Sequence, residues 1–230
     1  DLFFIISGFV ILMSADNKSC REFIVSRIVR LYPVYWFGCF FIFTFSYLWP
    51  VQRFDLTLID LAANLTMFQA YFNKPNLNGV FWTLVIEMQF YILTGVAIYT
   101  GLIKKTEWLL LGWLGLSVLA DYFPVPGFIK WFLVLDWCYY FIAGATFYLI
   151  WKDRVTLFRF ILLGLVFLQS LKHAYWYMLL KQRLTGIDYD PIVLGTVIAA
   201  FFGFFLMLSL HNLPGNYKFL AKQGALTYPL

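Results

Sequence analysis

The sequence has few charged residues. Asp, Glu, Lys and Arg make up 13% of its 230 residues, whereas hydrophobic residues make up 62%. A soluble globular domain carries about a quarter charged residues and about half apolar ones. The shortage of charge therefore excludes an ordinary soluble domain and predicts an all-α, polytopic transmembrane helical bundle. The net charge of +5 lies in short connectors, so it reports membrane orientation and predicts no nucleic-acid partner.

Several other features are missing. The three cysteines, Cys20, Cys39 and Cys138, have neither pairing nor metal-ligand spacing, so we expect no disulfide framework and no metal site. No repeat, low-complexity tract, soluble domain boundary or signal-peptide pattern is visible. We expect one integral-membrane domain over residues 1–230. Because the chain begins at Asp1 without Met and stops as a new apolar segment begins, we expect an internal piece of a longer protein, truncated at both ends.

Long apolar runs dominate what is present. Residues 2–13 are typical of the end of a first helix, and the further candidate spans are 34–49, 80–103, 108–123, 129–150, 157–171 and 192–210. Aromatic residues, 22% of the chain, suit lipid-facing surfaces and interfacial belts. Together these runs predict about seven to nine membrane helices. Pro33 is expected to open the run 34–49.

Residues 58–72 do not fit this pattern. The segment has fifteen residues and is interrupted by Asp60, Asn64 and Gln69, so it either lies in the interface or dips in and out. If it does not span, eleven of the 17 Lys and Arg lie inside and six outside; if it spans, the split is nine to eight. The positive-inside rule favours the first arrangement.

One carboxylate lies inside an apolar run. Glu87 belongs to the segment 80–91, Val-Phe-Trp-Thr-Leu-Val-Ile-Glu-Met-Gln-Phe-Tyr, and lies one to two helical turns beyond Trp82. A carboxylate at that depth is unfavourable unless it is paired, protonated or facing water. Glu87 is therefore either a functional group or a structural one that hydrogen-bonds a neighbour, with Tyr91 one turn along as a local partner. Asp136, seven residues into the run 129–150, is a rival carboxylate that would pair with the Glu87 region or line a wet cavity.

Arg27 and Arg30 are three residues apart and share one face of a helix. One interpretation is that they only hold a connector on the cytoplasmic side. The other is that two guanidinium groups bind phosphate bidentately, which lysine does not do. An acyl-CoA, with its pyrophosphate and 3′-phosphate, is one cytoplasmic ligand of this chemistry.

The connector 172–191 is rich in aromatic and charged residues. It contains His173, Tyr175, Trp176, Tyr177, Lys181, Arg183, Asp188, Tyr189 and Asp190. The favoured topology places it outside. Aromatic faces with hydrogen-bonding side chains suit a sugar acceptor, and an interfacial aromatic belt explains the same composition.

Three motifs in order resemble the acyltransferase-3 family. They are Phe3-Phe-Ile-Ile-Ser-Gly-Phe9, then Phe23-x3-Arg27-x2-Arg30-x2-Pro33-x-Tyr35, then Trp82-Thr-Leu-x2-Glu87-x-Gln-Phe-Tyr91. Weaker similarity is found in Phe141-Ile-Ala-Gly144 and in Gly224-Ala-Leu-Thr-Tyr-Pro-Leu230, so the resemblance covers the whole chain. The family comprises multi-pass membrane proteins that O-acylate sugars of bacterial envelopes and secreted metabolites.

The resemblance implies a function and a site. It implies transfer of an acyl group, expected to be acetyl, from acyl-CoA to a hydroxyl of a cell-envelope polysaccharide or other glycosylated acceptor, in a bacterial inner membrane and without a bound cofactor. Glu87 would be the catalytic carboxylate, orienting a histidine or donating a hydrogen bond. The implied substrate-binding residues are Arg27 and Arg30 for the acyl-CoA, Trp82 and Tyr91 to shape the site, Ser7 at the serine-glycine step, and Tyr228.

The chain departs from the family pattern in its histidines. The family's catalytic histidine precedes the Ser-Gly motif and a later one follows the Ser/Thr-Tyr motif, and neither falls within residues 1–230. His173, an expected exterior-loop residue, and His211, an expected helix-end residue, match neither position. We therefore expect this chain to be inactive alone. The alternative function is a multi-pass transporter or flippase for a lipid-linked or anionic substrate, with Glu87 and Asp136 lining its pathway.

Overall fold

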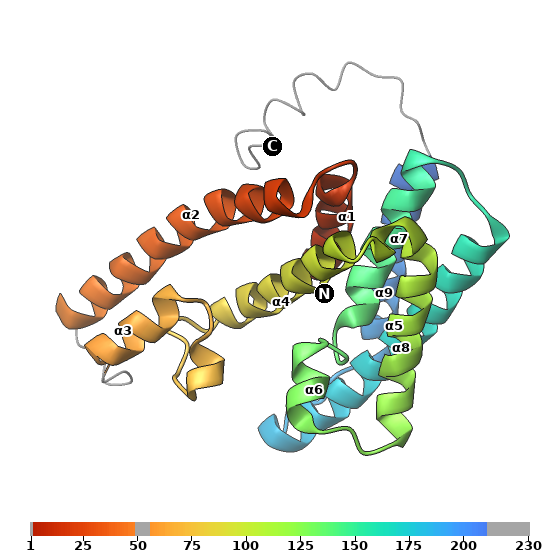
Figure 1. Cartoon of the computed structure of the whole chain (residues 1–230). Helices are drawn as coiled ribbons and strands as arrows, with labels where there is room; N and C mark the ends of the chain where they lie inside the picture. Colours follow the sequence, from red (N-terminus) through yellow and green to blue (C-terminus); the bar gives the residue numbers. More distant parts are fainter. Residues whose placement is uncertain (1, 49–55, 211–230) are drawn as a thin grey trace. The chain divides into compact units, whose positions relative to one another are not determined.

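The computed structural model describes residues 2–48 and 56–210, and all regular elements in these two stretches are helices (Figure 1). They are α1 (Leu2–Ala15), α2 (Cys20–Leu48), α3 (Leu58–Leu65), η1 (Gln69–Phe72), α4 (Phe81–Tyr99), η2 (Leu102–Lys105), α5 (Thr106–Tyr122), α6 (Gly127–Phe132), α7 (Cys138–Lys152), α8 (Leu157–Thr185) and α9 (Pro191–Leu210). The all-α prediction is confirmed. Among described residues, unit 1 contains 2–17 and 96–210, and unit 2 contains 18–48 and 56–95.

Within residues 2–48 and 56–210, four helices are long and apolar enough to cross a membrane: α2, α4, α8 and α9. Helix α1 is apolar but shorter. Only 11% of the apolar window of α2 is buried, and Val34 and Phe37 are more than 70% exposed. Such a surface is stable against lipid and unfavourable in water. The protein is therefore a multi-pass membrane protein, while the number of seven to nine membrane helices stays a prediction.

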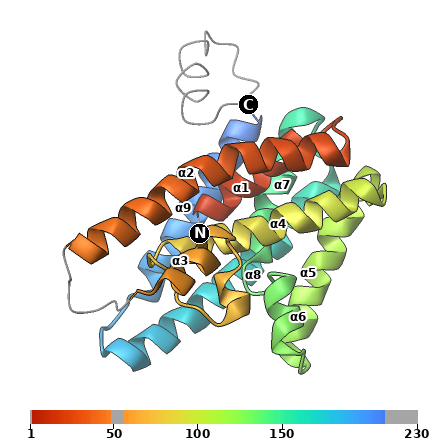
Figure 2. The same cartoon turned by 60° about the vertical axis from the view of Figure 1, so that its left-hand side comes forward.

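In unit 1, α1 and α7 lie side by side (Figures 1 and 2). Two glycines make this contact possible. A Cβ on Gly8 would lie 2.2 Å from the carbonyl oxygen of Phe141, and a Cβ on Gly144 would lie 2.0 Å from that of Ile5. The two backbones therefore meet directly, which only glycine allows. The Ser7-Gly8 step thus lies where α1 and α7 come closest together.

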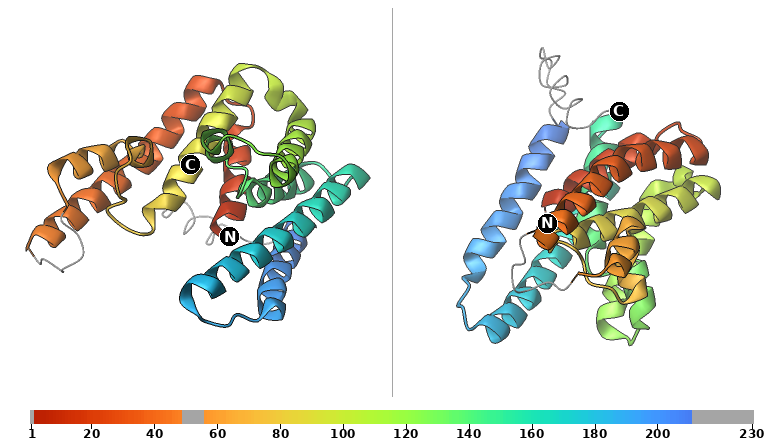
Figure 3. Two further views of the ribbon diagram at one scale, coloured as in Figure 1. Left: turned by 90° about the horizontal axis from the view of Figure 1, so that it is seen from below. Right: turned by 90° about the vertical axis from the view of Figure 1, so that its left-hand side faces the viewer.

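Helices α8 and α9 are antiparallel, and both contact α7 as well as each other (Figure 3). Helix α8 starts after Thr156, whose hydroxyl accepts a hydrogen bond from the Arg159 backbone N–H, and it stops at Gly186, which has a φ of 68°. The prediction of a span at 157–171 followed by a connector is wrong. The helix continues for 29 residues, because the aromatic and charged residues after Leu171 still favour helix and no Gly or Pro stops it before Gly186.

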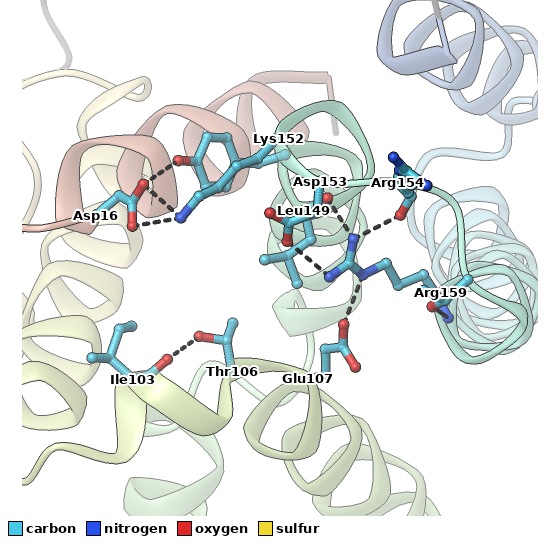
Figure 4. A network of polar contacts seen from close by, with 11 residues as sticks. Asp16, Ile103, Thr106, Glu107, Leu149, Lys152, Asp153, Arg154 and Arg159 are labelled. Atoms are coloured by element: carbon cyan, nitrogen blue, oxygen red, sulfur yellow. Dashed lines mark hydrogen bonds and ion pairs between the residues drawn. The ribbon is translucent and has the colours of Figure 1, made fainter.

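One arginine fastens the end of unit 1 where α7 joins α8 (Figure 4). The Arg159 side chain is 9% exposed and donates to Glu107, to Asp153, and to the backbone oxygens of Leu149 and Arg154. Its fork of donors adds hydrogen bonds to one carbonyl in the last turn of α7 and to one in the connector after it. The sequence suggested only a connector charge here. The structure shows instead that Arg159 is buried and joins α5, the end of α7 and the connector before α8 by hydrogen bonds and ion pairs.

A second ion pair at the same connector joins α1 to α7 (Figure 4). Lys152 Nζ lies 2.7 Å from Asp16 Oδ2, and the Tyr148 hydroxyl donates to the same carboxylate at 3.0 Å. The hydrogen bond from the Lys152 ammonium holds the pKa of the Asp16 carboxyl below its usual range. The loop after α1 is therefore tied to α7 by a charge that low pH removes.

The prediction of one uninterrupted span over 129–150 is wrong. A turn separates α6 from α7, and Val134 there has a φ of 55°, which is unfavourable for a β-branched residue. Side chains of α5 compensate: Trp113 Nε1 donates to the Leu133 oxygen at 2.7 Å, and the Ser117 hydroxyl donates to the Leu135 oxygen at 2.6 Å. Because these partners come from another helix, the apolar run alone could not reveal the break.

In unit 2, α2 and α4 pack antiparallel. The Cys20 thiol lies 3.4 Å from the Gly95 oxygen near one end, and the rings of Tyr35 and Phe81 lie 4.9 Å apart towards the other. The prediction that a span opens at Pro33 is wrong, because α2 runs through Pro33 without interruption. Arg27 and Arg30 therefore lie within this long helix and not in a connector.

Helix α3 is docked on α2 by three aromatic side chains. Tyr35, Trp36 and Tyr32 donate to the backbone oxygens of residues 64, 65 and 66 at 2.8, 2.9 and 3.1 Å. These carbonyl groups lie at the C-terminal end of α3, where helical donors run out, and that of residue 64 also accepts a hydrogen bond from the Met67 backbone N–H at 2.8 Å. With eight residues, α3 is far too short to span. The prediction that residues 58–72 do not form a simple span is therefore confirmed.

Candidate functional site

The antiparallel contact of α2 with α4 brings two predicted site regions together. Phe23 and Tyr91 meet edge to face, with ring centroids 6.4 Å apart. One turn after Phe23, the Arg27 guanidinium lies 5.8 Å from the Tyr91 ring centroid and 5.9 Å from that of Phe23. Arg27 is 4% exposed. The motif around Arg27 and the motif around Glu87 therefore form one cluster.

Glu87 and Tyr91 are joined within α4. The Tyr91 hydroxyl donates to Glu87 Oε1 at 2.9 Å, which is the local partnership that the four-residue spacing predicted. Tyr91 is 6% exposed, and Glu87 is half-buried. The carboxylate is therefore held in one orientation, while part of its surface stays accessible.

The charges of this cluster are only partly balanced. Tyr91 and Glu87 act electrostatically on the Arg27 guanidinium, and Arg30, one turn further along the same face of α2, adds a second positive charge. A buried guanidinium is stable only where such opposite charge and acceptors surround it. Two arginines beside one carboxylate leave one positive charge in excess. The site is thus suited to an anionic group, which two guanidinium forks would grip bidentately.

The depth of the arginines agrees with a site at a membrane surface. Helix α2 has 29 residues and is about 43 Å long, whereas a hydrocarbon core is about 30 Å thick. Arg27 and Arg30 lie about 10 and 15 Å from the start of α2 at Cys20. The last twenty residues of the helix, 29–48, suffice to cross the core, so Arg27 lies outside them. Arg30 lies in their first turn, from where its long side chain reaches the interface that the Cys20 end faces.

Other parts of the α4 motif face elsewhere. Gln89 is fully buried, and its Nε2 donates to the Tyr71 hydroxyl at 3.2 Å. Two residues turn a helix by about 200°, so Gln89 faces η1 while Glu87 faces α2. Trp82 is 38% exposed, and five residues separate it from Glu87 by about 140° around the helix. The cluster thus holds Arg27, Glu87 and Tyr91 but not Trp82.

The remaining predicted residues belong elsewhere. Ser7 is buried in α1 of unit 1, and Tyr228 and His211 lie outside the described residues. His173 is within α8, so the prediction of a loop residue is wrong. Asp136 is also not inside a span: it precedes α7, its side chain is 42% exposed, and it pairs with Lys130 at 2.7 Å. The turn after α6 carries it out of the helix.

Sequence reasoning missed an aromatic ring that contacts Arg27 from its own helix, α2. It matched Phe23 as a motif residue but gave it no role, and the structure places its fully buried ring against both Arg27 and Tyr91. The four-residue spacing between Phe23 and Arg27 was the available signal. Among the described residues, no group of three or more His, Cys, Asp or Glu side chains could hold a metal ion.

Fold and site together define a multi-pass helical membrane protein with a buried Arg–Glu–Tyr cluster between two helices. The family model described as an acyltransferase domain matches residues 1–230, and the chain belongs to this acyltransferase-3 family. Comparison with the curated proteins found no match, and comparison with the solved structures found none. The family supports acyltransferase activity, so the resemblance of the three motifs is confirmed.

Proposed function

We propose that the protein is an O-acyltransferase that moves an acyl group, acetyl in the first instance, from acyl-CoA to a hydroxyl of a cell-envelope polysaccharide or other glycosylated acceptor. The observation that carries this proposal is the cluster in which Arg27 meets the Glu87–Tyr91 pair, with Arg30 on the same helix face. The family membership supports the acyl chemistry, and the cluster supports an anionic donor. We place the protein in a bacterial inner membrane.

The reaction exchanges one ester for another. The acceptor hydroxyl oxygen attacks the thioester carbonyl, the C–S bond breaks, and the CoA thiolate leaves and takes up a proton. A base must remove the hydroxyl proton as the C–O bond forms. The family resemblance assigns that role to a histidine. No step therefore requires a redox cofactor.

The residues of unit 2 have separate roles in this proposal. Arg27 and Arg30 bind the phosphates of the donor, since guanidinium groups pair bidentately with phosphate oxygens. Glu87 is a positioning residue that orients the histidine and stabilises its positively charged, protonated form. The Tyr91 hydroxyl holds the Glu87 carboxylate in place. Because the two arginines reach the membrane interface, the donor can approach them from the aqueous side.

The test uses the protein as its gene encodes it, purified in lipid nanodiscs. Radiolabelled acetyl-CoA and a deacetylated envelope polysaccharide are supplied, and both thiol release and label in the polysaccharide are followed. We expect equal amounts of thiol and hydroxylamine-sensitive label. Movement of polysaccharide or lipid-linked sugar across a proteoliposome membrane without any ester formation would favour the transporter alternative and defeat this proposal.

A further inference from the structure

A pocket of about 1130 Å³ lies in unit 1. It is bounded by the turn before α7, the second half of α8 and the start of α9. Its volume exceeds the range of about 300–1,000 Å³ typical of pockets for one small molecule, so it has room for several sugar rings. We propose that this pocket binds the neutral carbohydrate acceptor, an inference that rests on the proposed acyl transfer.

The pocket lies at one surface of the membrane. Helix α8 has 29 residues and is about 43 Å long, so about nine residues exceed a core of about 30 Å. Counted from Leu157, twenty residues reach Trp176, and the rest of α8 extends beyond the core. The pocket-lining part of α8 begins at His173 and continues to Thr185. The pocket therefore opens at interface level, opposite the end that Arg159 fastens.

One end of the pocket carries hydrogen-bonding groups held by a charge network. His173 Nε2 lies 4.0 Å from Asp136 Oδ1 and 3.5 Å from Asp121 Oδ1. Lys130 pairs with Asp136 at 2.7 Å, and Lys172 pairs with Asp121 at 2.9 Å. Asp136 and His173 are thus fixed from several helices. The Asp136 side chain is still 42% exposed, so it can accept hydrogen bonds from hydroxyl groups.

Aromatic rings line the space beside these groups. The rings of Trp137 and Tyr177 meet edge to face at 6.2 Å, and that of Tyr139 lies 5.1 Å from His173. Trp176 also lines the pocket and is 62% exposed. The C–H faces of a pyranose ring pack on such aromatic faces while its hydroxyl groups reach polar neighbours at the edge.

The charges of the lining favour a neutral polar ligand. Asp136, Asp188 and Asp190 contribute three negative charges, and Lys181 and Arg183 contribute two positive ones. A phosphate-bearing donor needs an excess of cations, which this pocket does not offer. A lipid acyl chain would gain nothing from carboxylates at its side. A neutral sugar packs its ring on the aromatic side chains and donates hydrogen bonds from its hydroxyl groups to the carboxylates.

The experiment measures equilibrium binding of radiolabelled maltotetraose and chitotetraose to the protein in nanodiscs, without acyl-CoA. We expect saturable binding of at least one of them. Trp176→Ala and Asp136→Asn should each weaken it about tenfold or more, and Trp176→Phe, which keeps an aromatic face, should retain it within about threefold. Trp108→Ala is the matched control, because Trp108 is 66% exposed and lies outside the pocket. It should leave affinity unchanged.

The proposal that this pocket binds sugar is overturned by the absence of saturable binding. It is also overturned by equal affinity in the parent and Trp176→Ala when both proteins melt at the same temperature. Displacement of the sugars by short-chain phosphatidylcholine would assign the pocket to lipid and equally overturn the proposal. The acyl-transfer assay on the same variants separates the two proposals. Sugar binding without any transfer defeats the proposed function alone, whereas transfer with an unchanged acceptor KM in Trp176→Ala defeats the pocket alone.

Discussion

The Tyr91 hydroxyl donates a hydrogen bond of 2.9 Å to Glu87, and the face of the same Tyr91 ring lies 5.8 Å from the Arg27 guanidinium. One side chain thus contacts both the carboxylate of α4 and the arginine of α2. It joins two sequence motifs whose contacting residues, Arg27 and Tyr91, are 64 positions apart in the chain. This link makes specific predictions for each partner.

Glu87→Gln should lower kcat for acyl transfer about a hundredfold or more, the scale usual for a positioned acid–base group. The amide keeps the shape and accepts the Tyr91 hydrogen bond, but it carries no charge to orient a histidine. The KM for acyl-CoA should hold. Because Arg27 loses an opposite charge, the melting temperature should fall, and kcat is therefore measured well below the unfolding transition of the variant. Glu22→Gln is the control, because Glu22 is exposed and only caps the start of α2 through Ser19. Full kcat in Glu87→Gln would remove Glu87 from the mechanism.

Arg27→Lys and Arg30→Lys should each weaken acyl-CoA binding. Lysine keeps the charge but loses the planar fork, and the loss of one charged hydrogen bond is worth about 1.5–3 kcal/mol, or roughly tenfold to a hundredfold in Kd. Arg21→Lys is the control, since Arg21 is exposed on the first turn of the same helix. The measurement is titration with a non-hydrolysable acyl-CoA analogue. Unchanged Kd in both site variants would leave these arginines only a topological role.

Gly8→Ala and Gly144→Ala should each destabilise unit 1 by about 1–3 kcal/mol, because each new Cβ would meet backbone oxygen at about 2 Å. The double variant should lose less than the sum, since separating α1 from α7 once accommodates both methyl groups. Thermal unfolding in detergent gives the comparison. Gly164→Ala is the control: its Cβ meets nothing within 4 Å, and alanine favours helix, so its melting temperature should not fall.

Acid should weaken the tie between α1 and α7. The folded pKa of Asp16 is lowered by the hydrogen bond from Lys152, so this pair stabilises the fold above the unfolded pKa of about 3.9 and is lost as pH falls through the folded value. Asp16→Asn should therefore lower the melting temperature at pH 7 and have little effect near pH 3. A melting difference that stays constant over this pH range would contradict the assigned role.

The sequence by itself determined the class of the protein and the partners within single helices. The shortage of charge required a membrane environment, because that many apolar side chains cannot be buried in one soluble core. The four-residue spacing of Glu87 and Tyr91 predicted their hydrogen bond, since such neighbours share a helix face. The motif order predicted the family, which the match over residues 1–230 confirms.

Only the tertiary structure decided where helices break and which distant residues meet. The turn at Val134 exists because Trp113 and Ser117 of another helix satisfy its carbonyl groups, and an apolar run contains no trace of those donors. The contact of Arg27 with Tyr91 likewise depends on the antiparallel register of α2 and α4. The helical period determines on which face of its helix a residue lies, whereas packing between helices determines which residues that face contacts.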